Sequence, residues 1–196
     1  MKKIPTLFER RFENHKVVDI IPCINEELVT AFQFGDATVK YDGSCCAVIK
    51  GELYKRFDFK PGRKLPENAI PCQEKADPVT GHFPHWVKCN RNDPSDRWFF
   101  KALDFVLEHN AIVPDGTYEA IGEHFNGNPY NLRDDRLVRH GVCFANVERS
   151  YDTIRNWLAT HDHEGLVFWY DGKPVCKIKR TDFGFEWPIR SKEIKL

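Results

Sequence analysis

Charged side chains stand at several places where the neighbouring residues predict strands or turns. Lys40 is followed by Asp42 and Gly43, and a glycine there lets the backbone turn tightly. Glu119 lies mid-strand among apolar neighbours, where a carboxylate costs free energy unless it is paired or binds something. Glu164 opens a strongly apolar strand. These residue types could support chemistry on a charged ligand.

Two lysines alternate along the last predicted strand. Lys177 and Lys179 share one face of this strand, and Ile178 points to the other. Like charges this close repel each other unless an anion lies between them. The pair therefore indicates an anion-binding position. The alternative is an exposed edge strand on which the lysines deter aggregation.

Each of the other signals also fits a plain structural role when it is taken alone. Lys40 could lie on a hairpin closed by its Asp-Gly turn. Glu119, on the same strand face as Thr117 and Ile121, could form an ordinary salt bridge. The order of the set favours one site, because Lys-x-Asp-Gly, Glu, Glu-Gly-Leu-Val and Lys-x-Lys follow at gaps of 79, 45 and 13 residues.

The elements that must position these residues are mostly strands. Runs rich in β-branched residues predict them, with helices between them, so an α+β domain built on antiparallel sheet fits better than an alternating βαβ fold. The predicted strands are 16–21, 45–49, 117–121, 164–169 and 174–178. Residues 57–94 carry six prolines and mixed charges, which predicts a long irregular insertion with at most short elements.

Two segments have helical periodicity. In the first, apolar residues recur at the spacing of one buried face, and Asp93 followed by Pro94 suits a helix start. In the second, an apolar face follows Ser150, a plausible N-cap. The apolar residues are Phe99, Ala102, Leu103, Val106 and Leu107 in the first segment, and Ile154, Trp157 and Leu158 in the second.

Length and composition predict a single folded domain over residues 1–196. The formal net charge is zero, with 29 basic and 29 acidic residues, so a phosphate-binding surface would have to be a local patch. No apolar run reaches the roughly 18 residues of a membrane span, and the N-terminus lacks a signal-peptide pattern, which predicts a soluble cytoplasmic protein. The seven cysteines have no zinc-finger spacing, so free thiols are expected.

The ordered motif set resembles the covalent nucleotidyltransferase superfamily, which includes the DNA and RNA ligases and the mRNA capping enzymes. Three further stretches resemble the small RNA ligase family typified by the vertebrate 5′-to-3′ RNA ligase, and they extend the likeness from about Thr38 to Ile189. They are Gly-His-Phe-Pro-His-Trp-Val at 81–87, Gly-Glu-His-Phe-Asn-Gly-Asn-Pro-Tyr at 122–130 and Gly-Phe-Glu-Trp-Pro-Ile at 184–189. The resemblance implies an antiparallel-sheet, ATP-grasp-like ligase adenylation domain.

The resemblance implies that Lys40 attacks the α-phosphorus of ATP and forms a lysine–AMP intermediate. A lysine ammonium, with an ordinary pKa of roughly 10.4, is no nucleophile at neutral pH, and nearby cations and a metal ion favour the neutral amine. Lys177, Lys179 and Arg56 are the expected cations. Both lysines would also hold the α-phosphate and stabilise its charge in the transition state. Arg56 matches the family position that binds the ribose or the incoming phosphate.

The family also implies a magnesium site. Asp42, Glu119 and Glu164 are expected to hold Mg²⁺ partly through its waters, a sparse carboxylate set that suits this ion, and Mn²⁺ can substitute. Phe144 occupies the place of an aromatic ring that stacks on the purine, although a core phenylalanine is an equal alternative. Thr38 is expected to help read the base through its backbone.

After Lys40 is adenylylated, AMP would pass to the 5′-phosphate of an RNA end, and a 3′-hydroxyl would then displace it. On charge alone, Arg63, Lys64 and the tail 180–195 are expected to bind RNA phosphates. The loop 126–130 is expected to flank the nucleotide pocket. The protein is expected to be a monomer.

Two other functions use the same residues. An RNA-capping guanylyltransferase would use Lys40 with GTP, but such enzymes carry a further oligonucleotide-binding (OB-fold) domain. Only 17 residues follow Lys179, so no C-terminal OB-fold is expected. A non-catalytic module that binds nucleotide or RNA is the second alternative, and failure to form a covalent adduct would support it.

Overall fold

A computed structural model describes residues 3–14, 16–60, 62, 64–78, 80–109 and 112–189. Within this part the chain forms two compact units. Unit 1 comprises Lys3 and residues 42–140, and unit 2 comprises residues 4–41 and the described chain from Gly141 onward. A single adenylation domain over residues 1–196 stays a prediction.

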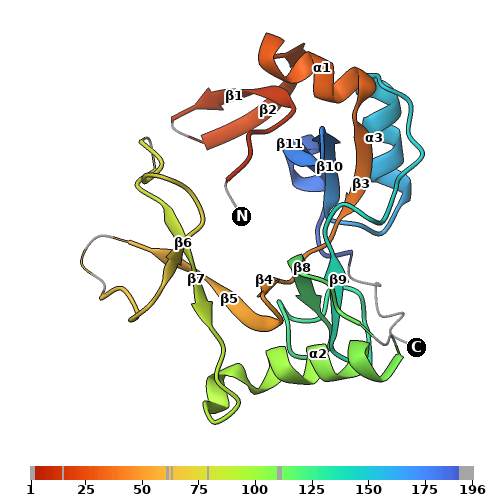
Figure 1. Cartoon of the computed structure of the whole chain (residues 1–196). Coiled ribbons are helices and arrows are strands. Elements are labelled where there is room, and N and C mark those ends of the chain that lie inside the picture. Colours follow the sequence, from red (N-terminus) through yellow and green to blue (C-terminus); the bar gives the residue numbers. More distant parts are fainter. Residues whose placement is uncertain are drawn as a thin grey trace. The chain divides into compact units, whose positions relative to one another are not determined.

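Unit 1 contains a six-stranded sheet in the order β6-β7-β5-β4-β8-β9, in which every neighbouring pair is antiparallel. Its helix α2 runs beside β8 and β9 (Figure 1). The elements are β4 (Ser44–Ile49), β5 (Glu52–Phe59), β6 (Ile70–Pro71), β7 (Phe83–Lys88), η1 (Pro94–Asp96), α2 (Arg97–His109), β8 (Gly116–Ile121) and β9 (Arg136–Arg139).

The two faces of this sheet differ because successive side chains on a strand alternate between them. One face packs on α2 and forms a core with Ala102, whose side chain is fully buried. This core contains Cys46, Leu53, Tyr118 and Ala120. The opposite face carries Cys45 and Glu119, which pair across β4 and β8. The predicted site residue on β8 therefore points away from the helix-covered core.

The first predicted helix is confirmed as α2, with a difference at each end. Asp93 does cap a helix that starts with Pro94, but this helix is the short η1 before α2, and the Asp93 carboxylate accepts from the Ser95 N–H at 2.9 Å. Leu107, predicted for the buried face, is 44% exposed.

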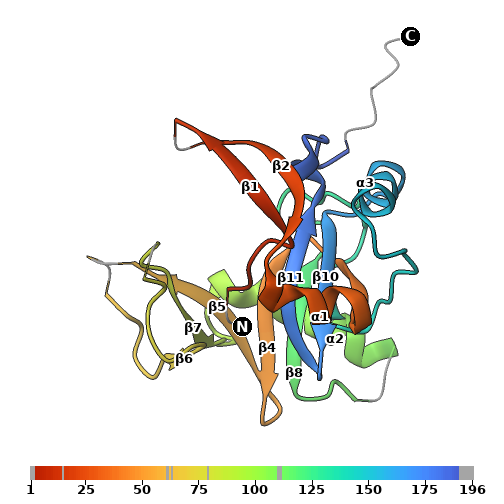
Figure 2. The ribbon, with the colours of Figure 1, turned by 90° about the horizontal axis from the view of Figure 1, so that it is seen from above.

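Unit 2 contains a three-stranded antiparallel sheet, β11-β10-β3, and a separate hairpin of β1 and β2. Figures 1 and 2 both show β10 and β11 side by side. The elements are β1 (Phe8–Glu13), β2 (Lys16–Ile24), α1 (Glu26–Phe34), β3 (Asp36–Lys40), α3 (Tyr151–Thr160), β10 (Gly165–Tyr170), β11 (Lys173–Lys179) and η2 (Arg180–Phe183).

The core of unit 2 packs α1 and α3 against one face of the three-stranded sheet. Leu166, Phe168 and Ile178 are fully buried there, and Ile154 and Leu158 of α3 meet them. The second predicted helix is confirmed, because Ser150 and Thr153 form a capping box at the start of α3. Capping satisfies N–H groups that have no partner within the helix.

Each of the five predicted strands is present, with ends shifted by a few residues, and the α+β class with antiparallel sheets is confirmed. The segment 57–94 contains two further paired strands, β6 and β7, and β7 forms a six-residue ladder with β5. No helix in the described part of the chain is long and apolar enough to cross a membrane.

Candidate functional site

Four of the predicted site residues share one face of the three-stranded sheet in unit 2. Gly165 in the central strand β10 pairs with Lys40 on one side and Lys179 on the other. Two residues on, Val167 pairs with Thr38 and Lys177. Because the side-chain period of a strand is two, all four lie on the face opposite Leu166, Phe168 and Ile178 of the core.

Glu164 joins two of these lysines. One carboxylate oxygen contacts the Lys40 Nζ and the other contacts the Lys179 Nζ, and both ion pairs are short. The Glu164 side chain is only 6% exposed, so it is held by these partners rather than by bulk water. The structure thus brings together Lys40 and Glu164, which are 124 residues apart in sequence.

Lys177 lies beside this cluster. None of the ion pairs found among the described residues joins its ammonium group to a carboxylate. Burial lowers its pKa to about 8, the Lys40 and Lys179 charges add to the effect, and Glu164 opposes it. A fraction of Lys177 is therefore neutral slightly above neutral pH.

The exposed-edge alternative for the lysine pair does not hold. The chain before β1 covers the β11 edge at Lys177, whose N–H donates to the Pro5 carbonyl at 3.0 Å. The Lys177 carbonyl accepts from the Leu7 N–H at 2.7 Å. Lys177 and Lys179 are both half-buried, so their role is not to keep a free edge charged.

Gly165 is required by the close approach of β10 and β11. A Cβ at this position would lie 2.1 Å from the Ile178 carbonyl oxygen. We expect Gly165→Ala to push the strands apart, to lower the free energy of unfolding by about 1–3 kcal/mol, and to weaken anion binding by separating Lys40 from Lys179. Chemical denaturation and phosphate titration measure these two effects.

Gly172→Ala is the matched control, because a Cβ at Gly172 meets nothing within 4 Å. Because φ at this position is +67°, an alanine adds backbone strain there. The variant should therefore lose stability while the lysines stay in place. Equal loss of anion affinity in both variants would contradict the assigned role of Gly165.

Thr38 and Phe144 meet at an isolated antiparallel bridge. Thr38 is buried, and its hydroxyl accepts from the Trp169 indole N–H at 2.9 Å and donates to the Val167 carbonyl at 3.3 Å. The Val39 N–H donates to the Cys143 carbonyl at 2.8 Å, which holds the segment that carries Phe144 against β3. Phe144 is 68% exposed, so the alternative of a core phenylalanine is wrong.

The other predicted residues belong to unit 1. Asp42 is held by the loop 126–130, since the Asn126 amide donates to its carboxylate at 2.9 Å and the Asp42 N–H donates to the Tyr130 hydroxyl at 2.7 Å. The Asn126 amide also donates to the Gly43 carbonyl at 2.7 Å. The hairpin alternative for Lys40 is wrong, because β3 pairs with β10 whereas β4 pairs with β5 and β8.

Gly43 and Glu119 are in direct contact. The Gly43 N–H donates to one Glu119 carboxylate oxygen at 3.1 Å, and the other oxygen lies 3.0 Å from the His140 Nε2. A Cβ at Gly43 would stand 2.1 Å from the Ala120 carbonyl oxygen. Gly43 lies at a bend of the chain, as predicted, and its lack of a Cβ also permits the close approach to β8.

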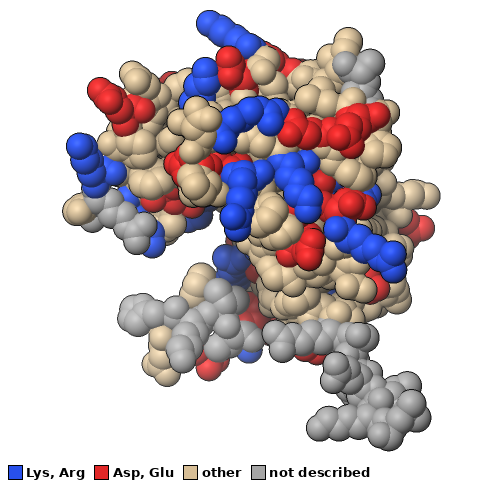
Figure 3. Space-filling model, turned by 90° about the horizontal axis from the view of Figure 1, so that it is seen from below, with Lys and Arg blue, Asp and Glu red and all other residues tan. Residues whose placement is uncertain are grey.

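Arg56 lies on β5, where its Nε donates to the Asp58 carboxylate at 3.0 Å. Lys64 is exposed, whereas Arg63 and residues 190–195 of the predicted RNA-binding set lie outside the described residues. Figure 3 shows Lys and Arg side chains interspersed with Asp and Glu over the face in view. The charges visible there form a mixed surface.

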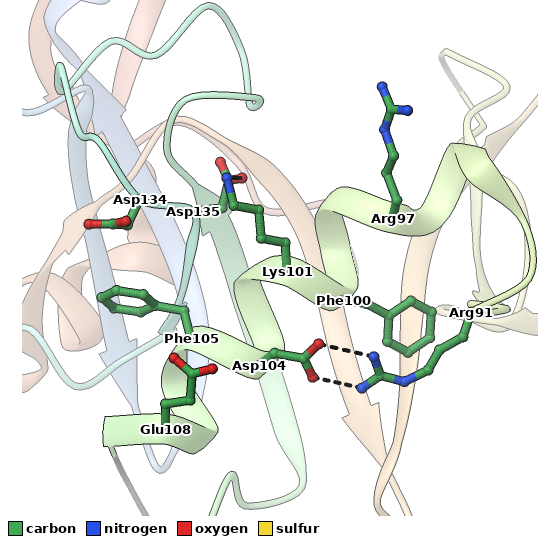
Figure 4. Close-up of a pocket in the computed structure, with 9 residues that line it drawn as sticks. All are labelled: Arg91, Arg97, Phe100, Lys101, Asp104, Phe105, Glu108, Asp134 and Asp135. Atoms are coloured by element: carbon green, nitrogen blue, oxygen red, sulfur yellow. Dashed lines mark hydrogen bonds and ion pairs between the residues drawn. The ribbon is translucent and has the colours of Figure 1, made fainter.

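A surface pocket of about 570 Å³ lies along α2 and contains none of the predicted site residues. Figure 4 shows that Arg91 pairs with both oxygens of Asp104, at 3.0 and 2.7 Å. Lys101 similarly lies 3.5 Å from the fully buried Asp135. These two ion pairs offset part of the charge that lines the pocket.

Two residues that lie beside Glu119 were not predicted as site residues from the sequence. Cys45 faces it across the ladder, and His140 contacts its carboxylate. The predicted strands 45–49 and 117–121 would place Cys45 opposite Glu119 only if their pairing register were known, and the sequence does not give that register. His140 is an isolated histidine after β9, and no local pattern marks it.

No family model matches the chain. The chain is 28% identical to a Rattus norvegicus protein named RNA ligase 1, 27% identical to the Pongo abelii protein of that name and 26% identical to the Danio rerio one. Each match covers 78% of this chain and 68% of the relative. The chain is therefore related to the RNA ligase family.

Proposed function

We propose that the chain is an ATP-dependent RNA ligase that carries AMP on Lys40 and joins RNA 5′-phosphate and 3′-hydroxyl ends. One observation carries the proposal: Lys40, Lys177 and Lys179 share a sheet face, and Glu164 contacts the first and last of them. A nucleophilic amine beside cations is the arrangement that transfer of a phosphate-bearing group needs. The relatives named RNA ligase 1 support the choice of substrate.

In the first step the Lys40 Nζ forms a bond to the α-phosphorus of ATP, the bond to the bridging oxygen breaks, and pyrophosphate leaves. The amine must first lose a proton. Glu164 is the carboxylate in contact with it and is the proposed acceptor. Lys179 and Lys177 hold the α-phosphate oxygens as their charge grows. The product is a phosphoramidate that retains the AMP moiety.

Asp42, Glu119 and Glu164 are proposed to hold Mg²⁺, because carboxylate oxygens are the donors that this ion prefers, and Mn²⁺ accepts the same donors. Mg²⁺, when bound, would offset the negative charge of the phosphates. Glu164 already bonds two lysines, and Glu119 accepts from the Gly43 N–H. Each carboxylate is thus oriented by the chain before any ion binds.

Other residues are proposed to bind the base and the sugar of the nucleotide. The exposed Phe144 ring is proposed to stack on the purine, and Thr38, bridged to it, positions that ring. Arg56 is proposed to bind the ribose or the incoming phosphate. We further propose a nucleotidyltransferase fold that acts as a monomer.

Two later steps complete the proposed reaction. The RNA 5′-phosphate attacks the phosphorus of lysine–AMP, which breaks the Nζ–P bond and yields adenylylated RNA. The 3′-hydroxyl then attacks the RNA phosphate and expels AMP. Both steps pass through the same lysine cluster, since each develops charge on phosphate oxygens.

Affinity for AMP is expected to fall as pH rises through about 8. The pKa of Lys177 is lowered to about 8, so below that pH the side chain is charged and attracts the phosphate, and above it the attraction is lost. The loss should approach about tenfold per pH unit, the limit for one linked proton. Calorimetric titration across this range measures it. A Lys177→Met variant should bind weakly with a flat profile, and an unchanged slope would refute the assignment.

The proposal is tested by incubating the protein with α-labelled ATP or GTP and Mg²⁺, followed by a denaturing gel. A labelled band with ATP, chased to product by RNA with a 5′-phosphate and a 3′-hydroxyl, is expected. A band with GTP alone would indicate a guanylyltransferase. The absence of a band with either nucleotide would indicate a non-catalytic binding module, provided that the protein is folded and not already adenylylated.

A further inference from the structure

Three potential metal-ligating side chains gather on the sheet face of unit 1 that points away from α2. The ligand atoms of Cys45, Glu119 and His140 all lie within 4.8 Å of one another. This is the sole such cluster of three found among the described residues. It joins a soft sulfur, an imidazole nitrogen and a carboxylate oxygen, a donor set unlike that of a magnesium site.

The sheet itself fixes the three side chains. Cys45 and Glu119 are cross-strand partners in the β4–β8 ladder and therefore project from the same face. His140 follows β9, and its N–H donates to the Thr117 carbonyl at 3.0 Å. The ring is held at both nitrogens, with Nδ1 3.0 Å from the Thr117 hydroxyl and Nε2 3.0 Å from the Glu119 carboxylate.

We propose that Cys45, Glu119 and His140 bind a thiophilic divalent cation of the Zn²⁺ class. Protein zinc sites combine these three ligand types, and three protein ligands leave a fourth position for water. Thr117 would be the outer partner that orients the imidazole, since a metal-bound histidine usually donates its other ring N–H to a nearby acceptor.

The dimensions and the burial suit such an ion. Zinc–ligand bonds of about 2.0–2.3 Å in tetrahedral geometry place ligand atoms roughly 3.5 Å apart. The cluster, already within 4.8 Å, needs side-chain adjustments of only about an ångström. The His140 and Glu119 side chains are 16% and 13% exposed, which screens the site from bulk water while keeping it reachable.

Charge and proton balance set the conditions for binding. Without a metal, burial raises the pKa of the Cys45 thiol to about 12, the Glu119 charge adds to the rise, and the Arg56 charge opposes it. The thiol is then protonated at neutral pH, and binding must form an S–metal bond while one proton leaves to solvent. Arg56 would repel the cation, but its pairing with Asp58 offsets that charge.

The site would make the thiophilic ion an inhibitor of the chemistry described above. Glu119 is both the proposed magnesium ligand and a ligand of this cluster, so one carboxylate serves one ion at a time. Zn²⁺ should therefore suppress adenylylation in competition with Mg²⁺. This consequence rests on the proposed function, whereas the binding site itself does not.

Binding is tested with Co²⁺ and Zn²⁺ on the whole protein in the absence of nucleotide. Co²⁺ should produce a thiolate-to-cobalt charge-transfer absorption, and Zn²⁺ should displace it with release of about one proton per ion. Cys45→Ser and His140→Gln should each lower Zn²⁺ affinity by at least about 100-fold, since loss of an outer partner alone costs about 10–100-fold. Cys23→Ser, which changes an exposed cysteine in unit 2, is the control and should bind normally.

Circular dichroism and chemical denaturation establish that each variant is folded. Absence of the cobalt band in the folded wild-type protein would overturn the site. A band that persists in Cys45→Ser would do the same, and Cys72→Ser would then show whether the half-buried thiol of Cys72 supplies it. If Zn²⁺ binds but does not inhibit adenylylation, the proposed binding site stands and only the competition with Mg²⁺ is refuted.

Discussion

The Lys40→Ala variant is expected to form no covalent nucleotide adduct. Lys40 supplies the nitrogen that bonds to phosphorus in the proposed first step, and removal of a nucleophile typically costs a factor of at least about a thousand. Its neighbours cannot replace it without rearrangement, because Lys179 lies on the other side of β10 and Lys177 lies two residues from Lys179 along β11. Gel detection of label from α-labelled ATP, with mass spectrometry of the modified peptide, measures the loss.

Two further observations separate lost chemistry from lost folding. Lys173→Ala, which removes an exposed lysine from the same strand β11, should label as strongly as the wild-type protein. Lys40→Ala should also still seal RNA that already carries AMP at its 5′-phosphate, because that last step forms no bond to Lys40. A labelled adduct in Lys40→Ala would show that another residue is the nucleophile.

The Glu164→Gln variant is expected to lose about 100- to 1,000-fold in the rate of adenylylation, the range seen when one preorganised polar contact is removed. The change takes away the carboxylate that contacts both Lys40 and Lys179 while keeping its size. It also leaves three neighbouring lysines without their buried counter-charge. The free energy of unfolding should fall by about 3 kcal/mol, the lower end for breaking a buried ion pair, since the lysines are partly exposed.

A shift in pH dependence distinguishes this role from a merely structural one. Glu164 raises the pKa of Lys177 against the larger effect of burial, so its removal should lower that pKa further. The fall in AMP affinity should then begin at a lower pH than in the wild-type protein. Glu13→Gln, an exposed change on β1, should alter neither rate nor profile. A normal rate with an unshifted profile in Glu164→Gln would exclude Glu164 from the site.

Local periodicity was sufficient for the elements whose own residues carry a strong pattern. The alternation of Lys177 with Ile178 predicted which side of β11 is charged, and the structure places Ile178 in the core. The cap at Ser150 was likewise readable, because a capping hydrogen bond involves only residues within one turn. Such features depend on neighbours a few positions away.

The strand β7 could not be predicted from the sequence in the same way. Its residues Phe83–Lys88 contain a proline and a histidine within a segment of six prolines, which argues against a strand. Pro84 and His85 are nonetheless buried, and the ladder to β5 supplies the backbone pairing that the local pattern does not indicate. Tertiary pairing outweighs weak strand propensity here.

The sequence by itself determined the types and order of the candidate site residues, and the strand faces of Glu119, Lys177 and Lys179. Only the tertiary structure decided that β3 pairs with β10, which brings Lys40 to Glu164, and that β4 pairs with β8, which brings Cys45 to Glu119. The physical reason is that a strand's period fixes which side each residue faces, whereas its partner and register depend on long-range packing. The close approach of Gly43 to β8 follows from the β4–β8 pairing, and the unpredicted contact of His140 with Glu119 follows from the pairing of β8 with β9.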